Sequence, residues 1–173
     1  LYTARKEHLM RPLIDIFENK TGIQVNILTA KTKILIKKIL DEGENSPADL
    51  LITVDAGNLN DAKLKNISQK INSKLLNQLV PENLRDVDGH WYGISIRSRV
   101  IMYNPTAVNP KEIMKYENLA DDGLAGRVCI RSSSNIYNQS LLASLIYHNG
   151  EEAALGWAKG VVKNFSRDPK GND

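Results

Sequence analysis

The chain has 173 residues, of which 42% are hydrophobic and 25% are charged, a composition typical of a globular α/β protein and not of a disordered or fibrous one. Its 23 basic and 20 acidic residues are interspersed and leave a net charge of +3, which disfavours nucleic acid as a partner. The single cysteine, Cys129, excludes an internal disulfide and a cysteine-based metal cluster, and no apolar run approaches the roughly 20 residues of a membrane span.

The first part of the chain predicts a helix followed by a strand. Residues 8–20 repeat apolar side chains at helical spacing, and Thr21-Gly22 ends the pattern. Residues 23–27 alternate apolar and polar side chains, as a strand with one buried face does. The face that we expect the helix to bury consists of Leu9, Leu13, Ile16 and Phe17.

The next segments continue the alternation of predicted helices and strands. A second apolar-periodic stretch begins near Ile34 and stops at Gly43, which predicts another helix. The short apolar run 50–54 follows a Pro-containing loop and is typical of a buried parallel strand. Asp55 stands where it could cap the following helix. This order predicts an open α/β sheet with crossover helices, whose ligands collect beyond the carboxyl ends of the strands.

The middle of the chain predicts a polar helix at about residues 57–66, a turn-rich stretch at 81–89, and strands at 91–94 and 99–103. Two arginines, Arg97 and Arg99, alternate with apolar residues near the second of these strands. Such a pattern places both arginines either toward a ligand or toward solvent, and we do not assign them to a site.

The last third predicts a second unit. A short helix near 111–119 and a strand at 127–131 precede a helix whose N-cap residues lie in the segment 132–135, and another helix spans about 151–164. A lone strand cannot make a sheet. We therefore expect the second unit to be unfinished at residue 173, and the numbering to begin inside the first strand.

Several segments, taken in this order and spacing, resemble the periplasmic ferric-iron-binding proteins of bacterial ABC importers. The resemblance covers nearly the whole chain. Its segments are YTAR at residues 2–5, FENKTGIQV at 17–25, GENSPADLLITVDAG at 43–57, LRDVDGHWYGISIRSR at 84–99, GRVCIRSSSNIYNQSL at 126–141, and residues 164–173.

The resemblance implies an α/β fold of the two-lobe (type II) periplasmic binding protein class, truncated to its N-terminal part. Residues 1–102 would form the first lobe, without its first residues and without a late segment that returns to it. Residues 103–173 would begin the second lobe and leave it incomplete.

The resemblance also implies a ligand set. Tyr137 matches a tyrosine that binds the metal in this family, whereas an adjacent tyrosine pair lies beyond the end of this chain. Some members carry a His-Tyr pair where this sequence has Lys6 and Glu7. This departure favours the version in which an arginine such as Arg5 holds a synergistic anion, carbonate or a similar small anion, that completes the coordination of Fe(III).

The chemistry of these residue types agrees with that implication. Ferric iron is a hard ion that prefers oxygen donors, and a phenolate is one of them. A planar guanidinium such as that of Arg5 binds a planar anion through two parallel hydrogen bonds. Ser134 and Asn135 lie at a helix start, where backbone N–H groups favour negative charge, and we assign them to the anion.

Each residue also has a structural interpretation. Without the resemblance, Tyr137 is a packed helical aromatic, Arg5 a surface cation or a member of an ion pair, and the serines and Asn135 a helix cap. The three histidines show no ligand spacing, and Asp49 and Asp55 are turn and cap residues. The sequence shows no catalytic motif.

We expect a binding protein and not an enzyme: one that captures ferric iron in the periplasm and delivers it to an ABC-type permease of the inner membrane. It would be a monomer when complete. The present chain alone would be iron-free or bind iron weakly, and its open sheet edges favour self-association. Two alternatives stay open: a binder of small anions such as phosphate or sulfate, and an enzyme or effector-sensing domain on the same scaffold.

Overall fold

The computed structural model describes residues 1–171, so Asn172 and Asp173, the end of the predicted second lobe, lie outside the described residues. The chain divides into two compact units, one formed by Leu1–Ile96 and one that begins at Arg97. The division between the compact units falls between Ile96 and Arg97, whereas the lobe boundary expected from the sequence, between residues 102 and 103, stays a prediction.

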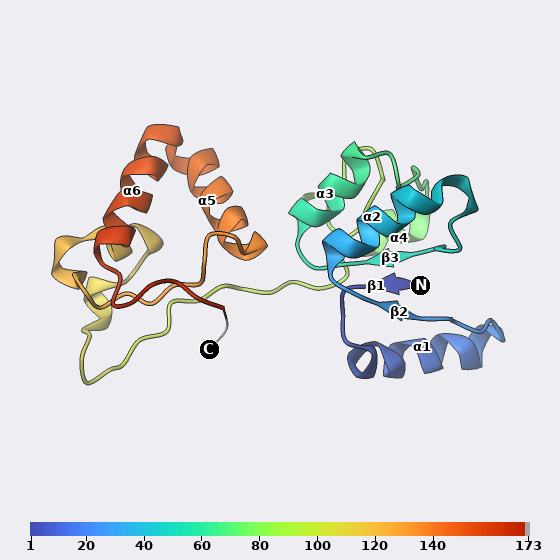
Figure 1. Ribbon diagram of the computed structural model, residues 1–173, viewed down its shortest axis with the longest axis horizontal. Helices are drawn as coiled ribbons and strands as arrows, with labels where there is room; N and C mark the ends of the chain where they lie inside the picture. Colours follow the sequence, from blue (N-terminus) through green and yellow to red (C-terminus); the bar gives the residue numbers. More distant parts are fainter. Residues whose placement is uncertain (172–173) are drawn as a thin grey trace. The chain divides into compact units, whose positions relative to one another are not determined.

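The first unit is built on a three-stranded parallel sheet in the order β2-β1-β3 (Figure 1). Its strands are β1 (Tyr2–Thr3), β2 (Leu28–Thr29) and β3 (Leu51–Ile52), with Tyr2 in register with both Leu28 and Leu51. Both pairings are parallel, as the alternation of helices and strands predicts. The central strand β1 is buried, and Thr3 is completely shielded from solvent.

The second strand lies later than the sequence predicted. The pattern favoured residues 23–27, but pairing with β1 begins at Leu28, whose N–H donates to the carbonyl oxygen of Leu1 at 2.9 Å, and ends where Ala30 donates to Thr3 at 3.2 Å. The prediction of a strand at 23–27 is wrong because pairing with a distant strand, and not local alternation, decides where a strand lies.

Helix α1 (Glu7–Thr21) covers one face of this sheet and α2 (Thr32–Glu42) the other (Figure 1). Gly22 ends α1 in the left-handed conformation at φ 72°, with its N–H bonded to the Glu18 carbonyl oxygen at 2.8 Å. The expected buried face is wrong, because α1 turns Met10 and Ile14 inward. Exposure remains at 44–56% for Leu9, Leu13, Ile16 and Phe17.

The rest of the first unit is helix and turn. Helix α3 (Ala56–Leu64) begins at Asp55, whose carboxylate accepts the Gly57 N–H at 2.9 Å, as the sequence predicted. A short helix α4 (Lys74–Leu79) follows, capped by Ser73. The predicted strands at 91–94 and 99–103 are absent. Within the described residues, this region forms only an isolated antiparallel bridge between Arg85 and Tyr92.

In the second unit, α5 (Ile136–Asn149) and α6 (Glu151–Lys163) pack against each other, and α6 also packs against the second of three short 3-10 helices. Those are Pro110–Glu112, Tyr116–Ala120 and Asp122–Leu124, where the sequence predicted one short helix. The core consists of Ile113, Leu124, Val128 and Val161.

The predicted strand at 127–131 is reduced to one parallel bridge between Val128 and Phe165. Val128 donates its N–H to the Asn164 carbonyl oxygen and accepts from the Ser166 N–H, both at 2.9 Å. A strand needs a longer partner, and the described part of the chain offers only this two-bond contact. No helix within residues 1–171 is both long and apolar enough to cross a membrane.

Candidate functional site

The carboxyl edge of the sheet in the first unit gathers polar side chains. Arg5 follows β1, Thr32 opens α2 beyond β2, and Thr53 follows β3. The hydroxyls of Thr32 and Thr53 lie 2.6 Å apart. Helices α1 and α3 leave the neighbouring strands β1 and β3 in opposite directions (Figure 1). In open α/β sheets, this switch point is where ligands bind.

Arg5 is half-buried at this edge. Its backbone N–H donates to the Thr3 hydroxyl at 3.0 Å, which holds the chain as it leaves β1. Within residues 1–171 the guanidinium makes no hydrogen bond or ion pair. The expected alternative of an ion-pair member therefore has no partner in the described part of the chain. A half-buried guanidinium with its donors available can bind an anion.

Tyr137 lies in the second unit, on the first turn of α5, and is half-buried. Its backbone N–H donates to the Asn135 side-chain oxygen at 3.0 Å, so Asn135 is the N-cap that the sequence predicted. The hydroxyls of Ser132 and Ser134 lie 3.0 Å apart in the preceding turn. The structural interpretation of Asn135 as a cap is thus confirmed, and this cap uses its side-chain oxygen.

Sequence reasoning left out Arg99, which lies against Tyr137. The guanidinium carbon is 5.6 Å from the centre of the Tyr137 ring, within the range of a cation–π contact. The guanidinium also donates to the Asn138 side-chain oxygen. The signal in the sequence was the alternation of Arg97 and Arg99 with apolar residues, which could not indicate the neighbours of either arginine.

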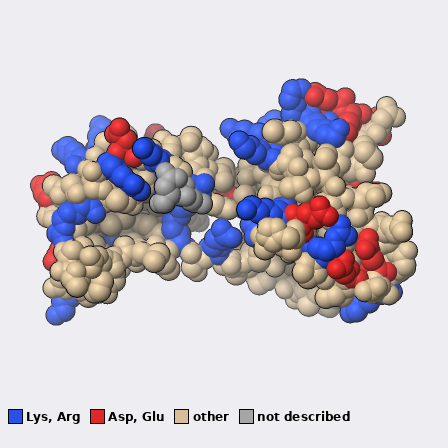
Figure 2. All heavy atoms as spheres, turned by 60° about the horizontal axis from the view of Figure 1, so that its bottom comes forward, with Lys and Arg blue, Asp and Glu red and all other residues tan. Residues whose placement is uncertain are grey.

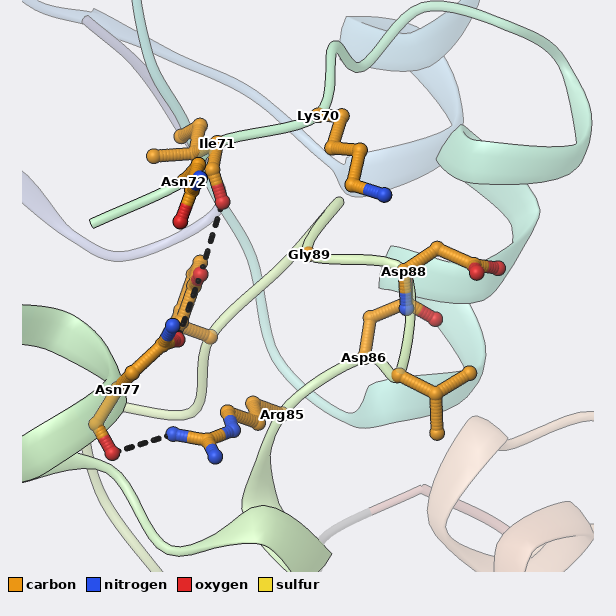
Figure 3. Close-up of a pocket in the computed structure, with 10 residues that line it drawn as sticks. Lys70, Ile71, Asn72, Asn77, Arg85, Asp86, Asp88 and Gly89 are labelled. Carbon is orange, nitrogen blue, oxygen red and sulfur yellow. Dashed lines mark hydrogen bonds between the residues drawn. The ribbon is translucent and has the colours of Figure 1, made fainter. Parts of the chain in front are cut away.

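An open pocket of about 310 Å³ lies elsewhere in the first unit, between the segment around Ile71 and the turn from Arg85 to Tyr92 (Figure 3). The Tyr92 hydroxyl donates to the Ile71 carbonyl oxygen at 3.0 Å, and Arg85 donates to the Asn77 carbonyl oxygen. Three of its charged side chains have ion-pair partners that do not line the pocket: Asp86 and Asp88 with Lys63, and Arg85 with Glu82. None of the predicted site residues lines it.

Histidine, cysteine, aspartate and glutamate are the residue types that most often bind metal ions in proteins. Among the described residues, no three His, Cys, Asp or Glu side chains come together as a metal site. His90 contacts the Ser68 hydroxyl at 3.1 Å, and His148 packs edge-on to the Tyr147 ring. On the face drawn in Figure 2, Lys and Arg are interspersed with Asp and Glu, as the sequence predicted.

The fold and these residues match a class of solute-binding protein. The profile of the family described as bacterial extracellular solute-binding protein matches residues 45–170, and this chain belongs to that family. The description of this family names the binding of solutes. The expected fold, an α/β periplasmic binding protein of which the chain covers about half, is confirmed.

Two of the relatives that this chain matches have names that refer to iron. The chain is 50% identical to Iron uptake protein A1 of Synechocystis over 173 residues, which is 100% of this chain and 48% of that protein. It is 30% identical to the Fe(3+)-binding periplasmic protein of Serratia marcescens over 167 residues, 96% of this chain and 49% of that protein. The chain therefore spans about half the length of the curated relatives it matches.

Solved structures show the same relationship. The Trichodesmium protein IdiA (FutA), in complex with iron and citrate ligands, matches with a TM-score of 0.94 and 50% identity over 99% of this chain and 54% of that chain. Apo FutA2 from Synechocystis matches with a TM-score of 0.91 and 44% identity over 99% of this chain and 53% of that chain. The roles of Tyr137, Arg5, Ser134 and Asn135 stay predictions.

Proposed function

We propose that this protein captures ferric iron in the periplasm and delivers it to an ABC-type permease of the inner membrane. The observation that carries the proposal is the 50% identity to an iron uptake protein along the whole chain. The Serratia relative is named as periplasmic and as binding Fe(3+), which supports both the compartment and the oxidation state. The permease is proposed from the solute-binding family alone.

Tyr137 is proposed as a ligand of the metal. A phenolate offers ferric iron a hard, negatively charged oxygen. A free tyrosine has a pKa of about 10, so the metal displaces the phenol proton as it binds, and binding weakens in acid. The position of Tyr137 on the first turn of α5 also suits a negatively charged oxygen, because the N-terminal end of a helix carries partial positive charge.

Arg5 is proposed as the anchor of a small synergistic anion that completes the coordination sphere. Its half-buried guanidinium has no partner within residues 1–171, and it lies at the sheet edge where ligands bind in such folds. The Trichodesmium structure is a complex with iron and citrate ligands, and on that basis we propose a carboxylate or carbonate as the anion. Ser134 and Asn135 would contribute to anion binding from the start of α5.

We propose that the two lobes close over the metal and that the permease recognises this closed form. A ligand can shift an open protein to a closed one only when it binds the closed form more tightly. We propose that residues 1–102 and 103–173 contribute to separate lobes, with Arg5 in one and Tyr137 in the other. Metal-binding and anion-binding groups from both lobes come together only in the closed form, so the closed form binds the metal more tightly.

The test is substitution of Tyr137 by Phe in the full-length protein, with Fe(III) affinity measured by competition against a chelator. We expect weaker binding and a loss or shift of the visible phenolate-to-iron charge-transfer band. Tyr147→Phe, an exposed tyrosine of the same helix, is the matched control. Equal colour and affinity in Tyr137→Phe and wild type would remove Tyr137 from the site.

A second experiment separates iron capture from the binding of small anions alone, which Arg5, without a side-chain partner within residues 1–171, also favours. Calorimetry with iron plus bicarbonate or citrate, and separately with phosphate and with sulfate, distinguishes the two. We expect Arg5→Gln to weaken iron binding and to abolish its dependence on the added anion. Tight binding of phosphate or sulfate without iron would replace the iron proposal.

A further inference from the structure

Arg99 is the charged group that the structure brings to Tyr137. Its guanidinium carbon lies 5.6 Å from the centre of the Tyr137 ring. Both residues belong to the second unit, although Arg99 comes from an irregular segment and Tyr137 from α5. A guanidinium stacked on an aromatic ring restricts the ring and places positive charge against its electrons.

The side chain of Arg99 is held by the helix residue next to Tyr137. Arg99 donates to the Asn138 side-chain oxygen, and the Asn138 amide nitrogen donates to the carbonyl oxygens of Arg131 and, at 3.4 Å, of Ser132. Asn138 therefore has both ends of its amide engaged. One end anchors the guanidinium, and the other end ties α5 to the turn that precedes it.

The backbone of Arg99 is held by a second, separate hydrogen bond. The Tyr116 hydroxyl donates to the Arg99 carbonyl oxygen at 2.9 Å. The Tyr116 carbonyl oxygen in turn accepts the indole N–H of Trp157, on α6, at 2.7 Å. A residue in an irregular segment thus has its main chain fixed to one helix and its side chain to another. Such double anchoring is what a positioning residue requires.

We propose that Arg99 is a positioning residue for the metal-binding tyrosine: it stacks on the Tyr137 ring, anchored by Asn138, and places a fixed positive charge beside the phenolate that binds ferric iron. The inference rests on the proposed iron site. Arg99 does not itself touch the metal. It acts through the ring, by restricting its orientation and by stabilising the negative charge that the metal-bound phenolate retains.

The charge has a spectroscopic consequence that a purely structural role lacks. In the charge-transfer transition an electron moves from the phenolate to the iron, away from the guanidinium. A positive charge against the ring makes that transfer cost more energy. Removing the charge therefore moves the absorption band to longer wavelength, whereas a loosened fold changes the band's intensity without this directed shift.

The experiment uses the iron-loaded full-length protein with Arg99→Gln, Arg99→Lys and Tyr137→Phe. Arg97→Gln is the matched control, because it removes an equal charge two positions away from Arg99. Among the described residues, Arg97 has no contact with the Tyr137 ring. The thermal unfolding midpoint of each iron-free variant shows whether it has folded. The readouts are the Fe(III) dissociation constant and the wavelength of the charge-transfer band.

We expect Arg99→Gln to weaken Fe(III) binding by about 5- to 30-fold and to move the band to longer wavelength. Arg99→Lys keeps the charge without the planar stack and should restore the wavelength in part. Arg97→Gln should leave both readouts at wild-type values.

The outcomes separate this inference from the proposed function. If Tyr137→Phe weakens binding while Arg99→Gln keeps wild-type affinity and wavelength, the positioning role is overturned and the iron site stands. If Arg99→Gln and Arg97→Gln shift the readouts equally, the effect is general charge and the role is also overturned. If Tyr137→Phe changes nothing, the iron site fails, and this role fails with it.

Discussion

Asp86 is a shielded carboxylate that the structure keeps charged. Its side chain is only 7% exposed, and its oxygens accept from the Lys63 ammonium at 2.8 and 3.0 Å. The backbone N–H groups of Asp88 and His90 donate to it at 3.2 and 3.1 Å. Burial by itself would raise the pKa of Asp86, but these hydrogen bonds outweigh it and lower the pKa below its usual value.

A carboxylate with a lowered pKa stabilises the fold above the pKa of the unfolded chain, about 3.9, and this contribution is lost as the pH falls through the lower folded value. We expect Asp86→Asn to destabilise the protein at pH 7 by about 1–3 kcal/mol, because it weakens these bonds. We also expect it to flatten the loss of stability below about pH 4.

Urea unfolding at pH 7, 4 and 3 measures both effects. Asp88→Asn is the matched control, because Asp88 contacts the same Lys63 ammonium at 2.7 Å but is 59% exposed, so its effect should be smaller. Equal losses for the two variants would show that shielding at Asp86 contributes nothing.

At the scale of elements, α6 packs its backbone directly against the 3-10 helix Tyr116–Ala120. A Cβ added at Gly160 would lie 2.7 Å from the Ala120 Cβ and 3.0 Å from the Ala120 carbonyl oxygen. At Gly156, one turn earlier on the same helix, an added Cβ would meet nothing within 4 Å. Two glycines of one helix thus serve different purposes.

We expect Gly160→Ala to destabilise the second unit by about 1–3 kcal/mol, because the contact with Ala120 cannot accommodate a methyl group. Gly156→Ala should stabilise it by about 0.5–1 kcal/mol, because alanine is the better helix former. Chemical unfolding followed by circular dichroism compares the two signs. A destabilising Gly156→Ala or a neutral Gly160→Ala would contradict this account of the packing.

Helices were predicted better than strands. The limits of α1 and α6 and the start of α5 agree with the sequence patterns to within about two residues, because their hydrogen bonds and caps are local. The strands at 23–27 and 91–94 were wrong: Leu28–Thr29 pairs with β1 instead, and within the described residues only an isolated bridge forms at Tyr92. Strand pairing depends on distant residues, which alternation cannot identify.

At the scale of the whole molecule, the chain spans about half the length of its relatives. Tyr137 is the one tyrosine that we propose as a ligand here, and one phenolate with one anion cannot fill the coordination sphere of a hard ferric ion. We therefore expect the 173-residue chain alone to bind Fe(III) at least 100-fold more weakly than the full-length protein, roughly 2.7 kcal/mol or more.

Chelator competition on the two proteins side by side measures this difference. Size-exclusion chromatography at several concentrations accompanies it, because the exposed side chains of Leu9, Leu13 and Ile16 favour self-association of the short chain. Tight, stoichiometric uptake of iron by the 173-residue chain as a monomer would contradict the expectation.

The sequence by itself determined the helices, the caps at Asp55 and Asn135, and the solute-binding family, because these depend on local hydrogen bonds and on ordered motifs. The tertiary structure decided which face α1 buries, where β2 pairs, and that Arg99 lies on the Tyr137 ring. Those features join residues far apart in the chain. Their free energy comes from contacts that no local pattern specifies.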